Sequence, residues 1–132
     1  MTRRIEDRAK SYLFHEFDRK EYSFEDAGSG KGFDLWMSNS DGVRQKAELK
    51  AHSGVYRRPS NLVERLIFNS EGERKLFEDG ETVIVRVFLG EKPIRVFVLT
   101  NKILGLGAEL SPESRYVLRG KIDYDDTYTE LT

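Results

Sequence analysis

The chain has 132 residues, no cysteine and a formal net charge of −1, with 34% of its residues charged. This length suits one domain with its own core, and without cysteine neither a disulfide nor a cysteine-bound zinc can form. No apolar run approaches a membrane span and no secretory signal follows the charged N-terminus, so we expect a cytoplasmic protein with no membrane association. The balanced charge argues against nonspecific coating of nucleic acid.

The first predicted element is a helix over residues 2–20. Two acids, Glu6 and Glu16, fall within or at the edge of its apolar stripe. They lie roughly 15 Å apart along the helix axis, so at most one can approach a given site. Both can instead extend to the flank of the helix and pair with arginines. The stripe itself consists of residues spaced three and four apart, Ile5, Ala9, Tyr12, Leu13 and Phe17.

A short strand over residues 22–25 and a glycine-rich loop over residues 27–32 come next. The loop lacks the spacing of a nucleotide-binding P-loop. Its glycines would allow a nucleic-acid backbone to approach closely, and Lys31 is a candidate phosphate contact. A plain connecting loop is the alternative.

Two strands joined by a turn follow, over residues 33–38 and 45–52. The first alternates apolar side chains with Asp34, and the second places Glu48 and Lys50 on one face and apolar residues on the other. The Asp41-Gly42 pair between them is a strong hairpin signal. Asp34 on the neighbouring strand can therefore reach the side chains of Glu48 and Lys50.

Two carboxylates converging from adjacent strands suit Mg²⁺ or Mn²⁺, which prefer oxygen ligands. An ammonium group beside the metal can position a water molecule and balance charge that develops on a phosphate. Asp34, Glu48 and Lys50 therefore outline metal-assisted hydrolysis of a phosphodiester. Taken alone, an acid and a Glu/Lys pair on a solvated strand face are ordinary, and the pattern Glu-x-Lys occurs by chance in many charged proteins.

The pattern G-F-D-L followed by A-E-L-K resembles the core of the PD-(D/E)xK nuclease superfamily. It is similar to the small archaeal Holliday junction resolvases and to nuclease-like domains of unknown function. The similarity covers the chain up to about Leu89, and Phe33 stands where the superfamily name has proline. The resemblance implies a restriction endonuclease-like core, with Asp34, Glu48 and Lys50 as catalytic residues and Asp34, Glu48, the Leu49 carbonyl and Glu6 as metal ligands.

After the second strand, Tyr56, Arg57 and Arg58 are candidates for gripping nucleic-acid phosphates. An exposed aromatic with two arginines suits single-stranded or splayed DNA, and a solvated loop is the alternative. Capping signals at Asn61/Glu64 and Ser70/Glu73 predict a helix over residues 61–68 and a shorter one ending at residues 79–80. Apolar strands over 82–89 and 94–100 should lie inside the sheet. A short helix over 101–106 and an edge strand over 115–119 follow.

Together these features predict an α/β fold, a central mixed sheet flanked by helices. Residues 1–120 would form one nuclease-like domain and residues 121–132 an acidic tail that is either loose or bound to a partner. The resemblance implies a divalent-metal-dependent DNA endonuclease that uses Mg²⁺ or Mn²⁺, and a homodimer would let it cut both strands. The alternatives are an inactive nuclease-like domain that binds nucleic acid or protein, or an enzyme that acts on another phosphate ester.

Overall fold

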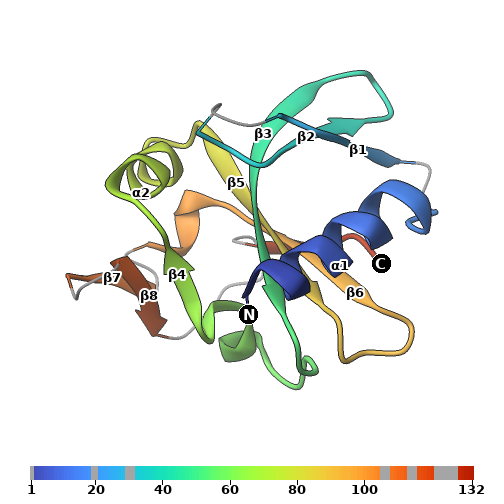
Figure 1. Cartoon of the computed structure of the whole chain (residues 1–132). Coiled ribbons are helices and arrows are strands. Elements are labelled where there is room, and N and C mark those ends of the chain that lie inside the picture. The colour runs from blue at the N-terminus through green and yellow to red at the C-terminus, as the bar shows by residue number, and fades with distance from the viewer. Residues whose placement is uncertain (1, 19–20, 29–31, 105–107, 113–115, 121–127) are drawn as a thin grey trace.

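The computed structural model describes residues 2–18, 21–28, 32–104, 108–112, 116–120 and 128–132 (Figure 1). A six-stranded mixed sheet has the strand order β1-β2-β3-β5-β6-β9, and a three-stranded sheet has the order β4-β8-β7. In chain order the elements are α1 (Thr2–His15), β1 (Tyr22–Asp26), β2 (Leu35–Asn39), β3 (Arg44–His52), the 3₁₀ helix η1 (Pro59–Val63), β4 (Leu66–Phe68), α2 (Glu71–Glu78), β5 (Thr82–Phe88), β6 (Arg95–Leu99), the 3₁₀ helix η2 (Asn101–Ile103), β7 (Ala108–Pro112), β8 (Tyr116–Gly120) and β9 (Tyr128–Glu130).

Helix α1 packs on one face of the main sheet, while α2, η1 and β4 pack on the other. Ala9 and Leu13 of α1 are buried against Leu35, Ala47 and Leu49 of the sheet. The α/β class and the central mixed sheet flanked by helices are therefore confirmed at this level.

Helix α1 ends at His15, earlier than predicted. The backbone N–H groups of Glu16 and Phe17 both donate to the Tyr12 carbonyl, at 2.9 and 2.8 Å. The Phe17 ring turns toward β1 and packs edge-on against Phe24, with ring centroids 5.2 Å apart. Burial of Phe17 against the sheet thus ends the helix.

The predicted hairpin of β2 and β3 is confirmed, although β2 begins at Leu35. The side chain of Asn39 accepts hydrogen bonds from the backbone N–H groups of Asp41 and Val43, at 2.9 and 3.0 Å. Gly42 has a φ of 80°, which a residue without Cβ adopts at little cost. This turn chemistry sets the register that pairs Leu35 with Ala47.

Strand β5 lies parallel to β3, and α2 belongs to the connection between them. All seven residues of β5 are buried, and β6 pairs with β5 antiparallel. The prediction of two inner apolar strands is confirmed. The predicted second helix is confirmed as α2, since the Ser70 side chain caps it by accepting from the Glu73 N–H at 3.2 Å.

The predicted helix over residues 61–68 is wrong. The Asn61 side chain accepts from the N–H groups of Arg57 and Arg58 at 2.8 and 3.0 Å, which closes the short helix η1 instead of starting an α-helix. Arg65 then adopts a φ of 56°, outside the helical region. Beyond it, Leu66 and Phe68 alternate into the core as strand β4.

The C-terminal part of the chain also differs from the prediction. Strand β8 is the middle strand of the small sheet rather than an edge strand. The last residues are not a loose tail, because β9 pairs with β6 and forms an edge of the main sheet. Leu131 is 3% exposed, and Glu130 forms a two-pronged ion pair with Arg95, at 2.6 and 2.8 Å. Residues 121–127 lie outside the described residues.

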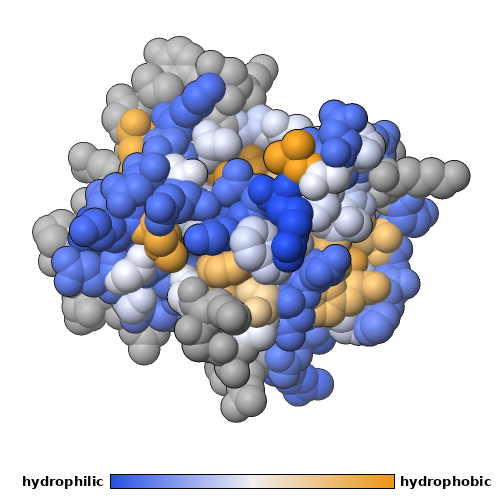
Figure 2. Space-filling model, turned by 90° about the horizontal axis from the view of Figure 1, so that it is seen from above, coloured by the Kyte–Doolittle hydropathy of each residue, from blue (hydrophilic) through white to orange (hydrophobic). Residues whose placement is uncertain are grey.

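The described surface is mainly polar. Its exposed large hydrophobic residues are Val43 and Val55, and Figure 2 shows a face on which hydrophilic residues surround separate groups of hydrophobic ones. Among the described residues, no helix is long and apolar enough to cross a membrane.

Candidate active site

Asp34 and Glu48 face each other across the β2–β3 pair. Asp34 directly precedes β2, whose ladder with β3 begins at the pair of Leu35 and Ala47, next to Glu48. The Asp34 N–H donates to the Ala47 carbonyl at 3.0 Å, and the Leu49 N–H donates to the Asp34 carboxylate Oδ2 at 2.8 Å. The backbone of β3 therefore holds the Asp34 carboxylate in place, close enough to Glu48 to raise the pKa of its carboxyl group.

Glu48 is a buried acid, with 3% of its surface exposed. Burial, the hydrogen bond with Asp34 and the negative charge of Asp34 raise the pKa of Glu48 to about 10, against the opposing effect of Lys50. In the metal-free protein at neutral pH, a proton on Glu48 therefore separates the two carboxyl groups. A divalent cation could take the place of that proton.

Lys50 extends from β3 toward helix α2. Its Nζ lies 3.2 Å from the Oε1 atom of Glu73 and 5.7 Å from the ring centroid of Phe68. Glu73 also accepts a hydrogen bond from the backbone N–H of Asn69 at 3.1 Å. The sequence indicated Glu73 only as part of a helix cap, so its contact with Lys50 was missed.

Of the two acids on the first helical segment, Glu6 belongs near this site and Glu16 does not. Burial and the charge of Asp34 raise the pKa of Glu6, while Lys10 and Lys50 act to lower it. These mutual effects place the Glu6 carboxylate within electrostatic range of both Asp34 and Lys50. Glu16 follows the end of α1 and is exposed.

A cavity of about 800 Å³ opens beside Asp34 and Glu48. Its lining is rich in acids, which would repel a bare nucleic-acid backbone and attract cations. The described residues that line it include two lysines and six acids, namely Lys10, Lys75, Asp26, Asp34, Glu48, Glu73, Asp79 and Glu81. Entry of a phosphate into this cavity would therefore require compensating positive charge.

The donor set fits a divalent cation of the Mg²⁺ kind. No group of three or more His, Cys, Asp or Glu side chains within the described ranges is arranged as a complete metal cage. Mg²⁺, however, is commonly held by one or two carboxylates while water and substrate phosphates fill the other positions. Asp34 and Glu48 supply two such carboxyl groups, and Leu49 remains a predicted third ligand through its carbonyl.

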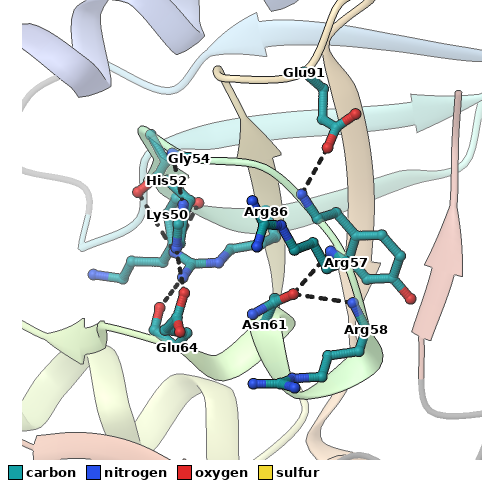
Figure 3. A network of polar contacts seen from close by, with 11 residues as sticks. Lys50, His52, Gly54, Arg57, Arg58, Asn61, Glu64, Arg86 and Glu91 are labelled. Atoms are coloured by element: carbon teal, nitrogen blue, oxygen red, sulfur yellow. Dashed lines mark hydrogen bonds and ion pairs between the residues drawn. The ribbon is translucent and has the colours of Figure 1, made fainter.

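The predicted nucleic-acid contacts are only partly accessible. Arg57 and Arg58 are exposed and follow the C-terminal end of β3 (Figure 3). They line a separate cavity beside His52, which lies roughly 13 Å along the strand from Glu48. Tyr56 is half-buried, with its ring centroid 4.7 Å from Phe97, so the expectation of an exposed aromatic is wrong. Its ring packs on Phe88 and Phe97, and its backbone N–H donates to the Glu91 carboxylate at 2.8 Å. Lys31 lies outside the described residues.

His52 has a structural explanation. Its Nε2 atom lies 2.9 Å from the Glu64 carboxylate, and its Nδ1 accepts from the Gly54 N–H at 2.9 Å (Figure 3). Burial lowers the pKa of His52, against the opposing effect of the hydrogen bond to Glu64. Both ring nitrogens are therefore occupied in shaping the turn after β3.

Comparison with known proteins adds no family to this description, because no protein-family model, curated protein or solved structure matches the chain.

Proposed function

We propose that the protein is a divalent-metal-dependent endonuclease that hydrolyses phosphodiester bonds in DNA. The observation that carries the proposal is that the Asp34 carboxylate, just before β2, is held against β3 beside Glu48, with Lys50 two residues along that strand. This arrangement combines hard oxygen ligands with an adjacent ammonium group, as metal-assisted hydrolysis requires.

Each residue of the site has a distinct task in this proposal. Asp34 and Glu48 would hold Mg²⁺ or Mn²⁺, which when bound polarises the phosphate and lowers the pKa of water. Lys50 donates hydrogen bonds that orient the attacking water toward phosphorus and offset the growing negative charge. The water oxygen bonds to phosphorus, the bond to the leaving oxygen breaks, and that oxygen takes up a proton. Glu6 adds a second-tier carboxylate on the side of α1.

The order of elements also supports the proposal. The resemblance to the PD-(D/E)xK superfamily implies a helix, a strand with Asp, a strand with Glu-x-Lys, then a helix and two apolar strands. Helix α1, strands β2 and β3, helix α2 and strands β5 and β6 follow in that order. Arg57 and Arg58 are the described exposed residues that we assign to DNA phosphates. A homodimer would supply the second site needed to cut both strands.

The test is cleavage of end-labelled linear, flapped and four-way-junction DNA with Mg²⁺ or Mn²⁺. Wild-type protein should cut at least one substrate, EDTA should stop the reaction, and Lys50→Ala should reduce the rate at least a hundredfold. Lys46→Ala, which removes a half-buried lysine two residues before Glu48, serves as the matched control.

The second candidate is a nuclease-like domain that binds but does not cut. Its partner would be nucleic acid or protein, and the acidic lining of the cavity favours a protein with a basic surface, because such a lining repels DNA in the absence of metal. Folded protein that cleaves none of the three substrates would support this candidate.

A further inference from the structure

A second cavity lies behind Lys50, between the start of α1 and strand β4. Its volume is about 150 Å³, and Lys50, Arg65, Arg86, Glu6 and Asn69 contribute to its lining. At roughly 30 Å³ per water molecule it has room for a few waters or one phosphate group. It is too small for a nucleotide, since sites for small organic ligands begin at about 300 Å³.

The buried side chain of Arg86 lines this cavity and lacks an acidic partner among the described residues. The residue is 1% exposed, and its guanidinium donates to the backbone carbonyls of Lys50 at 3.3 Å and of Glu64 (Figure 3). Its Nε–H has no hydrogen-bond partner among the described residues. No carboxylate of the described residues forms an ion pair with it, so a buried positive charge is held by neutral oxygens alone.

Among the described residues, the acids near this cavity pair with Lys50 but form no ion pair with its two arginines. The Glu64 carboxylate contacts His52 at 2.9 Å, and Glu64 reaches Arg86 through its backbone carbonyl. The lining holds three basic side chains and one acid, Glu6. Lys50 is already paired with Glu73 at 3.2 Å, so Arg65 and Arg86 are the basic side chains of the lining that form no ion pair with a carboxylate of the described residues.

The backbone conformation of Arg65 is a second, independent indication of a ligand. It is exposed and has a φ of 56°, a conformation that is uncommon for a residue with Cβ. Its neighbour Glu64 is fixed through the backbone carbonyl by Arg86. A rigid support thus presents an otherwise unfavourable arginine at the mouth of the cavity.

We infer that the cavity lined by Lys50, Arg65 and Arg86 binds one phosphate group of a nucleic-acid strand, next to the site where that strand is cut. The inference rests on the proposed function only in assigning the phosphate to nucleic acid. A phosphate there would supply hydrogen-bond acceptors to cationic donors. It would also anchor a strand that the acidic cavity on the other side of Lys50 repels.

The test uses the whole protein in EDTA, so that neither metal nor cleavage contributes. Thermal unfolding is followed while inorganic phosphate is titrated against sodium chloride of equal ionic strength. A ligand that binds only the native state raises the unfolding midpoint with concentration. The key variant is Arg65→Asn, because asparagine tolerates positive φ. Lys102→Asn, at an exposed lysine that lines none of the three cavities described, is the matched control.

We expect phosphate to raise the midpoint of wild-type and Lys102→Asn protein above the chloride reference. Arg65→Asn should need at least tenfold more phosphate for the same rise. Equal midpoints in phosphate and chloride, or an Arg65→Asn titration that matches wild type, would overturn the inference. Because no metal is present, the result does not depend on whether the protein cleaves DNA.

Short oligonucleotides then identify the source of the phosphate group. Anisotropy titrations in EDTA compare strands that carry a 5′-phosphate, a 3′-phosphate or neither, with inorganic phosphate as competitor. Binding that requires a terminal phosphate assigns the cavity to a strand end, and equal binding of all three, displaced by phosphate, assigns it to the backbone. Oligonucleotide binding that inorganic phosphate does not displace would count against the cavity as the binding site.

Discussion

Lys50 and Glu73 form an ion pair between strand β3 and helix α2, with Lys50 Nζ 3.2 Å from Glu73 Oε1. Their side chains are 10% and 18% exposed, so the pair is largely shielded from solvent. Removing one partner of such a pair leaves the other charge poorly compensated. Helix α2 therefore fixes the position of the ammonium group that the proposed reaction requires.

Glu73→Gln should lower the cleavage rate about tenfold with little change in the apparent affinity for DNA. The amide can still accept a hydrogen bond, but it no longer holds Lys50 by charge, so the loss of positioning should appear in kcat. Single-turnover and steady-state kinetics measure the two effects separately. Glu71→Gln, on the same helix with a side chain 73% exposed, is the control. Equal rates for both variants and wild type would contradict the role assigned to Glu73.

Asp34→Asn should abolish cleavage without unfolding the protein. An asparagine side-chain oxygen can still accept the hydrogen bond that the Leu49 N–H donates to Asp34 at 2.8 Å. The same amide oxygen can accept a hydrogen bond from the protonated Glu48 carboxyl group, so the variant leaves no buried donor without a partner. Circular dichroism during thermal unfolding, together with the cleavage assay, tests both expectations. A variant that fails to fold would show that Asp34 is structural.

Glu48→Gln should stabilise the metal-free protein at neutral and alkaline pH. The pKa of Glu48 is raised from 4.5 to about 10 in the native protein. At pH values between these two, Glu48 is ionised in the unfolded chain but still protonated in the native protein. Stability then falls as pH rises through this window. The groups that face Glu48 include Asp34, Lys50 and Glu73. At pH 8, about 3.5 pH units above the ordinary glutamate value, the glutamine variant should be more stable by about 5 kcal/mol, and at pH 4 equal to wild type.

Urea unfolding in EDTA at a series of pH values measures this difference. Asp41→Asn, at an exposed turn residue, controls for the loss of a carboxylate. Curves for Glu48→Gln and wild type that stay parallel from pH 4 to pH 8 would show that Glu48 ionises as an ordinary acid.

Leu131→Ala should destabilise the protein by about 3 kcal/mol, because it removes a buried side chain from the core. Leu131 is 3% exposed, and its N–H donates to the Val96 carbonyl at 2.8 Å. Val43→Ala, at a side chain 62% exposed, should cost little. Denaturant unfolding compares the two variants, and equal small losses would argue that the C-terminus is not part of the core.

Local pattern was sufficient to predict the hairpin of β2 and β3, the capped helix α2 and the two buried strands. In each case the alternation, turn residues or capping residue agreed with the final structure. The helix predicted over residues 61–68 failed because Asn61 caps backwards onto Arg57 and Arg58. An asparagine side chain can accept hydrogen bonds from backbone N–H groups that precede it or that follow it, and tertiary packing decides between the two.

The candidate site likewise combines residues that local pattern predicted with residues that only tertiary packing brings in. Neighbouring strands brought Asp34, Glu48 and Lys50 together, so their grouping followed from the alternation of side chains. Glu73 and Arg86 reach the site from α2 and β5, and their contacts depend on how these elements cross. The pairing of β9 with β6 likewise depends on contacts distant in sequence, and its acidic composition suggested a tail instead.

The most direct test of the account is Mn²⁺ binding, measured by electron paramagnetic resonance on wild type, Asp34→Asn, Glu48→Gln and Lys50→Ala in the absence of DNA. We predict a Mn²⁺ site in wild type that is weakened at least tenfold in Asp34→Asn and in Glu48→Gln but kept in Lys50→Ala, since Lys50 is not a ligand. Binding should strengthen with pH, because the cation displaces the proton on Glu48. No Mn²⁺ binding in wild type, or binding as strong as wild type in either carboxylate variant, would contradict the proposed metal site.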